Sequence, residues 1–581
     1  MQPTSPAPDF KNMLLALALA TMVMAGWQYF YEAPRQNAQQ ATMAKHRAEA
    51  TARRAKKAAQ VAEADAAAAK EGGQRIPIES PRLRGSIALT GGRIDALTLS
   101  DYHNTLEKGS GEVELLKPAG SKDAYFVETG LLSTGSKMPK ATTVWKEDDD
   151  MRAPDGPINL IWNNGAGLIF RKAISFDANY MFTITYSVEN RTESDVTIYP
   201  YGLISRNYED NAKHYLIMHE GPLAVTNGVL TDTTYEQLRE DGPQKFPHAT
   251  GWLGITDKYW LTALIPGDGM SFDAKFKRVK QGERDTYQVD YRGEELVVPA
   301  GGEANTTVRL FAGAKEVKLL DHYRAEFGIP LFDRAVDFGS LYFLTKPIFL
   351  LLNFFHTLVG NFGVAILLLT CCIKLVLYPL ANKSYTSMSQ MKLLVPQMNE
   401  IKERYADDKM KMNVAVMELY KREGVNPMSG CLPILIQIPV FFSLYKVLFV
   451  TIEMRHAPFF GWIHDLSAPD PTNIFTLFGL IPWDAPGFLH IGVWPLIMCA
   501  TMVMQQRLNP KPADPVQATV ITYMPYVFLF LFAKFPAGLV IYWAWNNTLS
   551  ILQQSLIQHR IKKHGHKKKK PAAKKAARPK R

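Results

Sequence analysis

The sequence predicts a polytopic α-helical membrane protein with six transmembrane helices, a large all-β domain and a cytoplasmic helical hairpin. Six long apolar segments of the 581-residue chain contain no Asp, Glu, Lys or Arg. A helix that crosses the hydrocarbon core needs about 20 mostly apolar residues, so these segments indicate membrane spans. Between the first and second segments, apolar and polar residues alternate in short runs, as they do in half-buried strands.

The first apolar segment, Met13–Tyr31, predicts an uncleaved transmembrane anchor at residues 1–31. A preceding Lys11 also fits a cleaved signal peptide, but no clean small-x-small cleavage site follows. Trp27 and Tyr29 instead resemble the aromatic belt of a membrane interface. Residues 32–75 are rich in Ala and are expected to form a partly helical linker.

Residues 76–335 are expected to form an antiparallel β domain that ends in a helix at about Val317–Phe327. Phe182, Ile184, Tyr186 and Val188 alternate with polar residues, which is the period of a half-buried strand. Glycine-containing turn sequences separate further runs of this kind. These further runs are Ile94–Leu99, Tyr287–Tyr291 and Thr306–Phe311.

The rest of the chain, residues 336–558, is expected to be a helical membrane core. Gly360 and Gly363 interrupt its first apolar segment, which is therefore divided into a helix lying on the membrane surface and a span. The expected elements are an interfacial helix at 338–358, spans at 360–381, 431–452, 488–506, 516–534 and 538–557, a hairpin at 384–424 and a basic tail at 559–581.

Charge in the loops predicts the orientation of these spans. Asn382–Gly430 carries eight Lys or Arg residues, whereas Arg455–Gly487 carries one Arg and three Asp. Basic loops stay in the cytoplasm, so both termini are expected there. The β domain is then periplasmic if the source is a Gram-negative bacterium, and the chain is a multi-pass inner-membrane protein.

Residue patterns typical of enzymes are missing from the sequence. All four cysteines lie in apolar segments, so the β domain has no disulfide framework. There is no H-E-x-x-H, G-x-S-x-G or C-x-x-C pattern, and Gly130–Lys137 resembles a phosphate loop only superficially, because Ser136 replaces its lysine. We therefore expect no catalytic residue, metal ion, cofactor or small-molecule substrate.

Lys374 is the charged residue that needs an explanation. A lysine at the centre of a span costs about 2.5–3.5 kcal/mol on insertion scales. One explanation is that its side chain snorkels toward the cytoplasmic interface near Lys383. The other is a water-filled cavity inside the bundle, which polar residues in the spans favour. These polar residues are Thr370, Gln437, Thr522, Asn546 and Asn547.

Two further features indicate contact with partners. Seven methionines lie between Met388 and Met428, and methionine suits a surface that accepts many shapes, although a self-packed hairpin core explains them equally well. Nine lysines, three arginines and no acidic residue follow from Arg560 to the end of the chain. Such a tail sets the topology and is expected to bind ribosomal RNA or anionic lipid. The contact residues expected in it are Lys567, Lys568, Lys569 and Lys570.

Several motifs of the core together resemble the YidC family of membrane protein insertases. They are "NPMSGCLPILIQIPVFFSLY" (Asn426–Tyr445), "APFFGWIHDLSAPDP" (Ala457–Pro471), "KLVLYPL" (Lys374–Leu380) and "FPAGLVIYW" (Phe535–Trp543). The resemblance covers about residues 335–560 in order. The anchor and β domain resemble the long Gram-negative form of the family.

The resemblance implies a periplasmic β-supersandwich and a five-helix insertase core behind the N-terminal anchor. It also implies a hydrophilic groove that carries a positive residue, usually arginine, where this chain has Lys374. Lysine keeps the charge but lacks the planar fork of arginine. The implied groove residues are Lys374, Gln437 and Thr522, and the implied client slide is Thr370, Ile438, Phe441, Tyr542 and Trp543.

The resemblance further implies that nascent membrane proteins, the Sec translocon, the ribosome and the lipid bilayer are partners. Clients are expected to meet the cytoplasmic hairpin at Met388, Met391, Met398, Met410 and Met417. Two other functions remain open from the residues alone. A secondary transporter would show inverted repeats, and no second copy of the Gly360–Lys374 segment is present. The second open function is that of an assembly chaperone without insertase activity.

Overall fold

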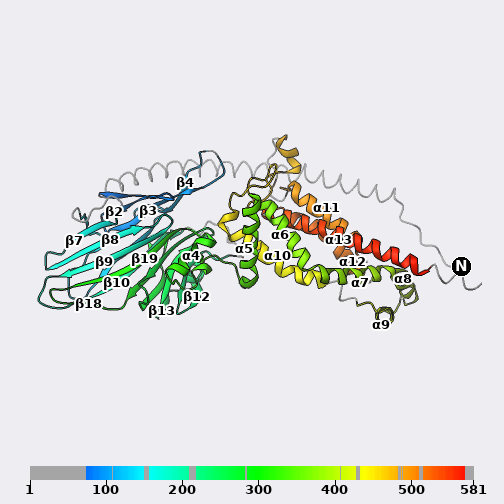
Figure 1. The fold of residues 1–581 in the computed structure, drawn as a ribbon, viewed down its shortest axis with the longest axis horizontal. Helices are drawn as coiled ribbons and strands as arrows, with labels where there is room; N and C mark the ends of the chain where they lie inside the picture. The colour runs from blue at the N-terminus through cyan, green and yellow to red at the C-terminus, as the bar shows by residue number, and fades with distance from the viewer. Residues whose placement is uncertain are drawn as a thin grey trace, which may run out of the picture.

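The computed structural model divides into a β domain and a helical core (Figure 1). It describes residues 74–107, 109–148, 156–208, 218–281, 284–405, 407–426, 432–481, 486, 489–509 and 515–569. The expected anchor at residues 1–31, nearly all of the linker and the tail from Lys570 onward lie outside the described residues.

In the described residues of the β domain, the chain forms nineteen strands and two α-helices. The strands are β1 Arg75–Glu79, β2 Leu83–Ala88, β3 Arg93–His103, β4 Glu112–Leu116, β5 Tyr125–Leu132, β6 Lys146–Glu147, β7 Ile158–Asn163, β8 Leu168–Phe176, β9 Met181–Asn190, β10 Val196–Tyr208, β11 Gly221–Thr226, β12 Val229–Asp232, β13 Gln244–Ala249, β14 Gly251–Thr256, β15 Trp260–Pro266, β16 Phe272–Gln281, β17 Arg284–Gly293, β18 Leu296–Val298 and β19 Glu303–Ala314. The helices are α3 Tyr235–Glu240 and α4 Val317–Glu326.

These strands form two antiparallel sheets with a shared apolar core. In one sheet the strand order is β1-β2-β3-β5-β10-β17-β16-β13, and β4 pairs in addition with β3 and β18 with β10. In the other sheet the order is β12-β11-β14-β15-β19-β9-β8-β7-β6. Phe182, Ile184 and Val188 of β9 are buried, as period two predicts. The strands predicted from the alternating runs are therefore confirmed, in β3, β9, β17 and β19.

The described part of the core contains helices in the expected apolar segments and in the polar region between them. They are α5 Tyr342–Val359, α6 Phe362–Val376, α7 Tyr378–Leu393, α8 Val395–Arg404, α9 Lys409–Arg422, α10 Leu432–Val450, α11 Val493–Leu508, α12 Pro515–Phe532 and α13 Ala537–Lys569, together with 3₁₀ turns at Phe332–Ala335, Ile452–Met454 and Ile474–Gly479. Helices α8 and α9 lie at the end of the core that is distal from the β domain (Figure 1).

The expected span at 360–381 contains a sharp bend in the structure. Helix α6 ends at Val376, and α7 starts at Tyr378, after the single residue Leu377, in a direction bent by 70°. Pro379 stands in the first turn of α7, where its missing N–H is tolerated, whereas inside a continuous helix it would break the hydrogen-bond ladder. The region expected as the hairpin, 384–424, contains most of α7 together with α8 and α9.

Length and composition identify α5 as a candidate span among the described helices, and the bent pair α6–α7 as a second. The expected number of six spans therefore stays a prediction. Helix α5 begins at Tyr342 rather than at 338, because Gly339 donates its N–H to Asp337 Oδ1 in a turn with positive φ. In Figure 1 it runs across the direction of α10 and α13, between the β domain and the core.

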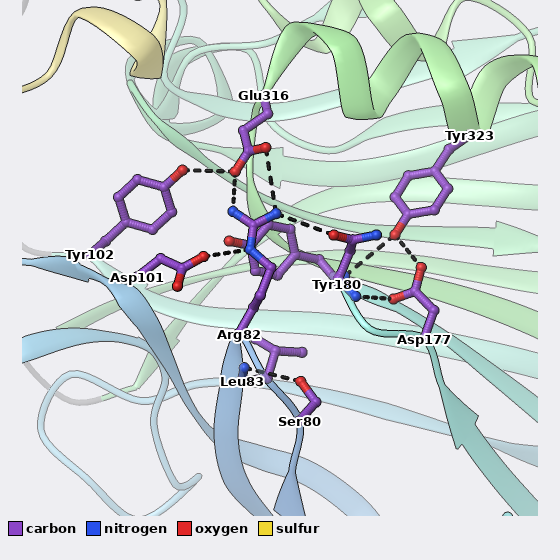
Figure 2. Close-up of polar contacts among 10 residues, drawn as sticks. Ser80, Arg82, Leu83, Asp101, Tyr102, Asp177, Tyr180, Glu316 and Tyr323 are labelled. Carbon is purple, nitrogen blue, oxygen red and sulfur yellow. Dashed lines mark hydrogen bonds and ion pairs between the residues drawn. The ribbon is translucent and has the colours of Figure 1, made fainter.

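A polar network joins the first strands of the β domain to α4 (Figure 2). The Arg82 guanidinium pairs with Glu316, which also accepts a hydrogen bond of 2.8 Å from Tyr102 Oη. Arg82 lies over the Tyr180 ring, with its Cζ atom 4.5 Å from the ring centroid. Glu316 is the residue immediately before α4, so this network sets where that helix leaves the β domain.

The same region contacts the outer end of α10. Glu453, in the turn after α10, accepts a hydrogen bond of 3.1 Å from Val317 N, while its other carboxylate oxygen is buried without a partner among the described residues. Lys446 Nζ lies 2.9 Å from Asp337 Oδ2, and Asp337 also accepts from His219 N at 3.1 Å. The β domain is therefore docked on the core through directed polar contacts.

Glu453 predicts a pH dependence of stability. Burial raises the pKa of this carboxyl group to about 7 in the folded protein. Between its ordinary value near 4.5 and 7 the folded state binds more protons than the unfolded state, so stability falls as pH rises through this window. Glu453→Gln keeps the acceptor for Val317 N and should raise the melting temperature at pH 8 but not at pH 4.5.

Melting curves of the detergent-solubilised chain at the two pH values would measure this effect. Glu303→Gln is the control, because Glu303 is exposed on β19 and its replacement should leave the pH dependence as it is. Equal melting temperatures for Glu453→Gln and the unmodified chain at pH 8 would contradict this prediction, because they would show that ionisation of the buried carboxyl group does not lower the stability of the fold.

Candidate functional site

Lys374 and Ser550 join α6 to α13 at the centre of the candidate site. Lys374 Nζ donates a hydrogen bond of 2.7 Å to Ser550 Oγ, and Ser550 Oγ donates one of 2.8 Å to the Asn546 carbonyl oxygen in its own helix. Ser550 is buried, whereas Lys374 is half-buried. A charged donor among apolar helices needs partners of this kind, because an ion without them is costly to remove from water.

Two cavities meet at Lys374, which is the one residue that lines both. The first has a volume of about 30 Å³, roughly that of one water molecule, and brings Lys374 together with Gln437 of α10. Tyr385, Tyr542 and Asn546 supply further polar groups to its wall. The second has a volume of about 310 Å³ and lies between α6 and α13. Lys374 therefore lies between two cavities whose walls are mostly apolar and carry a few polar side chains.

Thr522, the third expected groove residue, is not brought to either cavity. It is exposed on α12, and its hydroxyl group donates a hydrogen bond of 2.7 Å to the Ala518 carbonyl oxygen of the preceding turn. A threonine that satisfies its hydroxyl group in this way can face a lipid chain at little cost. The structure thus unites Lys374 and Gln437 and leaves Thr522 apart.

Aromatic rings form a continuous cluster between α10, α12 and α13. The ring centroids of Phe441 and Trp543 are 4.7 Å apart, and Phe532 lies 4.9 Å from Trp543. Ile438, one turn before Phe441, is exposed on α10. Two of the expected slide residues are therefore in contact with each other, and a third lies beside them.

The other two expected slide residues are buried. Tyr542 lines the small cavity with Gln437 rather than the outer surface of the bundle. Thr370 is buried in α6, where its hydroxyl group donates a hydrogen bond of 2.6 Å to the Ile366 carbonyl oxygen. Neither side chain is placed at the surface in this structure.

The hairpin methionines fall into two groups. Met388, Met391 and Met398 are buried in a small core that also includes Ile557 of α13, so these three hold the hairpin together and attach it to the bundle. Met410 and Met417 are 82% and 51% exposed on α9, and Val414 lies between them at 59%. Spacings of four and three residues place these three side chains on one face of the helix.

The basic tail is described only in part. Lys567, Lys568 and Lys569 belong to the last turn of α13, but their side chains lie outside the described part of the chain, as does all of Lys570. Their expected contacts with the ribosome or with lipid remain predictions.

A tightly folded loop covers the end of the core nearest the β domain. The buried Asp470 carboxylate accepts hydrogen bonds from Trp462 Nε1 at 3.1 Å and from Trp494 N, at the start of α11, at 2.9 Å. A Cβ atom on Gly363 of α6 would lie only 2.0 Å from the Phe459 ring. The loop is thus packed directly onto α6 and α11 at this end of the bundle.

Ser550 was missed by the analysis of the sequence. It is one of several hydroxyl residues in the apolar segments, and nothing in its spacing from Lys374, far away in the chain, pairs the two. A search for polar side chains four residues apart in one span would have marked Asn546 and Ser550, but not their partner.

Comparisons with known proteins cover both parts of the chain. The model of the YidC periplasmic domain matches residues 75–351, and the model of the 60Kd inner membrane protein matches residues 354–564.

The relatives are similar over most of their length. A membrane protein insertase YidC from Granulibacter bethesdensis is 52% identical over 84% of this chain and 87% of its own. A second, from Methylobacterium radiotolerans, is 45% identical over 95% of both chains. A third, from Rickettsia felis, is 47% identical over 94% of this chain and 98% of its own. The chain therefore belongs to the YidC family of membrane protein insertases, non-enzymatic proteins of the inner membrane with a periplasmic β domain.

Proposed function

We propose that this insertase moves transmembrane segments of newly made proteins from the cytoplasm into the inner membrane through a hydrophilic, positively charged groove. The observation that carries the proposal is Lys374, held by Ser550 at the wall of a cavity that it shares with the polar side chains of Gln437 and Asn546. Neither nucleotide hydrolysis nor a covalent intermediate is needed in this mechanism.

The groove acts by lowering the cost of moving polar groups across the bilayer. Each backbone group that loses its hydrogen bonds in hydrocarbon costs several kcal/mol. A water-lined path that covers part of the bilayer shortens the dry distance. The Lys374 ammonium attracts acidic residues of the translocating segment, and the attraction is stronger than at an open surface because the local dielectric constant is lower.

The aromatic cluster of Phe441 and Trp543 offers the client an apolar exit toward lipid. Ile438 extends this surface outward on α10. Burial of the client's own apolar helix in the bilayer supplies the driving force, at about 25 cal/mol per Å² of apolar surface. The loop held by Asp470 keeps the opposite end closed, so the client leaves sideways.

The exposed face of α9 is proposed to receive clients before insertion. Met410, Val414 and Met417 present flexible and apolar side chains at the end of the core distal from the β domain (Figure 1). The three buried methionines of the hairpin keep a structural role in this proposal.

The proposed topology has six spans, with α5 on the membrane surface and both termini in the cytoplasm. The crosswise direction of α5 in Figure 1 supports its surface position. The ribosome, through the basic tail and the cytoplasmic loops, and the Sec translocon are proposed partners of the protein. Insertion of a single-span client into liposomes that contain only this chain would test whether it acts alone.

Replacing Lys374 should selectively slow clients with acidic translocated tails. Lys374→Ala is expected to reduce their insertion rate about tenfold, equivalent to about 1.4 kcal/mol, whereas Lys374→Arg retains the charge and most of the rate. Insertion into proteoliposomes, measured by protease protection, gives the rates. The control is Lys383→Ala, an exposed lysine in α7. A wild-type rate for a folded Lys374→Ala variant would remove the electrostatic step from the mechanism.

Ser550 should contribute to stability through its bond to Lys374. Ser550→Ala is expected to cost about 1.5–3 kcal/mol, the usual range for a hydrogen bond to a charged group. Thr548→Ala is the matched control in the same helix, because the Thr548 hydroxyl group bonds only to the Ala544 carbonyl oxygen of its own helix. Thermal unfolding in detergent should separate the two variants, and equal losses would argue against a special role for Ser550.

The two groups of methionines should respond differently to substitution. Met410→Ser with Met417→Ser should weaken capture of an apolar client about tenfold and leave the melting temperature unchanged, because both side chains are exposed. Met388→Ser with Met398→Ser should instead lower the melting temperature, since both are buried. Cross-linking to a nascent client measures capture. Unimpaired capture by the first pair would exclude the α9 face as the docking surface.

A further inference from the structure

The larger cavity beside Lys374 has a composition different from that of the proposed client groove. It lies between α6, the start of α7 and α13, toward the end of the core that is distal from the β domain. Its volume is about 310 Å³, and it shares only Lys374 with the smaller cavity. Its walls are formed by Cys371, Lys374, Leu375, Tyr378, Leu549, Gln553, Leu556, Ile557 and Arg560.

The polar side chains of this cavity are suited to an anion. Lys374 and Arg560 supply two positive charges, and none of the lining residues in the described part of the chain is Asp or Glu. Gln553 Nε2 is buried and donates no hydrogen bond within the described residues. An unsatisfied amide donor costs free energy, and a negatively charged acceptor would remove that cost.

The remaining walls are apolar and open outward. Leu375 and Leu556 are 71% and 62% exposed, and both border the cavity. In a membrane protein such side chains contact acyl chains. A ligand that fits this cavity is therefore anionic at one end and apolar along the rest of its length.

The length of the cavity matches one leaflet of the bilayer. From Leu549 to Arg560 α13 advances eleven residues, which is about 16 Å at 1.5 Å per residue. Half of the hydrocarbon core is about 15 Å thick. With Arg560 at the headgroup level, Leu549 and Lys374 then lie near the middle of the membrane.

We propose that this cavity is a binding site for an anionic phospholipid of the leaflet distal from the periplasmic domain. The lipid phosphate accepts hydrogen bonds from Arg560 and Gln553, and an acyl chain extends along Leu556 and Leu549 toward Leu375. A zwitterionic lipid fits less well, because its cationic group would lie at the headgroup level beside the Arg560 guanidinium, and no lining residue in the described part of the chain is a carboxylate. The client path through Gln437 and Tyr542 lies in the other cavity and stays open.

Lipid retention by the full chain tests the proposal. The protein is reconstituted in vesicles of equal parts phosphatidylcholine and phosphatidylglycerol and extracted in mild detergent, and the lipids that co-purify are quantified by mass spectrometry. We expect phosphatidylglycerol to be enriched about fivefold over phosphatidylcholine. Arg560→Gln with Gln553→Leu should abolish the enrichment. Arg422→Gln with Gln397→Leu, the same exchange in a contacting pair of the hairpin, should preserve it.

Three results would overturn the proposal. The first is equal retention of the two lipids by the unmodified chain, and the second is full enrichment in a folded Arg560→Gln, Gln553→Leu variant. The third is loss of the bound lipid on addition of 50 mM inorganic phosphate, which would identify a site for a free anion. Insertion of a client with an uncharged tail, measured in the same vesicles, reports separately on the insertase function.

Discussion

The structure depends on keeping one ammonium group among apolar helices. Lys374 is acceptable in α6 because Ser550 Oγ accepts a hydrogen bond from its ammonium group and a cavity adjoins it on each side. Without these partners the charge would oppose the burial of α6 against α13. The same arrangement leaves the charge available, since the ammonium group has no carboxylate partner among the described residues. The proposed attraction for acidic client segments depends on this lack of a fixed counter-charge.

The two ends of the core are built in opposite ways. Near the β domain, Asp470, Glu453 and Asp337 hold loops and helix ends by directed hydrogen bonds and ion pairs. At the distal end the helical path bends at Leu377, between α6 and α7. Helices α7 to α9 follow this bend, and α9 has an exposed apolar face. In the proposed mechanism, this difference between the two ends directs insertion toward lipid rather than through a continuous pore.

Features that depend on local pattern could be predicted from the sequence, and features that depend on distant partners could not. The alternation of apolar and polar residues located strands of the β domain. The position of Lys374 inside an apolar segment identified it as a candidate site residue. The pairing of Lys374 with Ser550 and the separation of Thr522 depend on how helices rotate against each other, which composition does not specify. The two roles of the methionines likewise follow from tertiary packing, because Met398 and Met410 differ in burial rather than in chemistry.

The measurement that tests this account most directly is water access to position 374. In a chain whose four native cysteines are replaced, a Lys374→Cys variant in intact inner-membrane vesicles would be treated from the cytoplasmic side with a membrane-impermeant maleimide. The account predicts labelling before detergent is added, at a rate well above that of a cysteine at exposed Leu375 in the lipid. Labelling of position 374 only after solubilisation would contradict it.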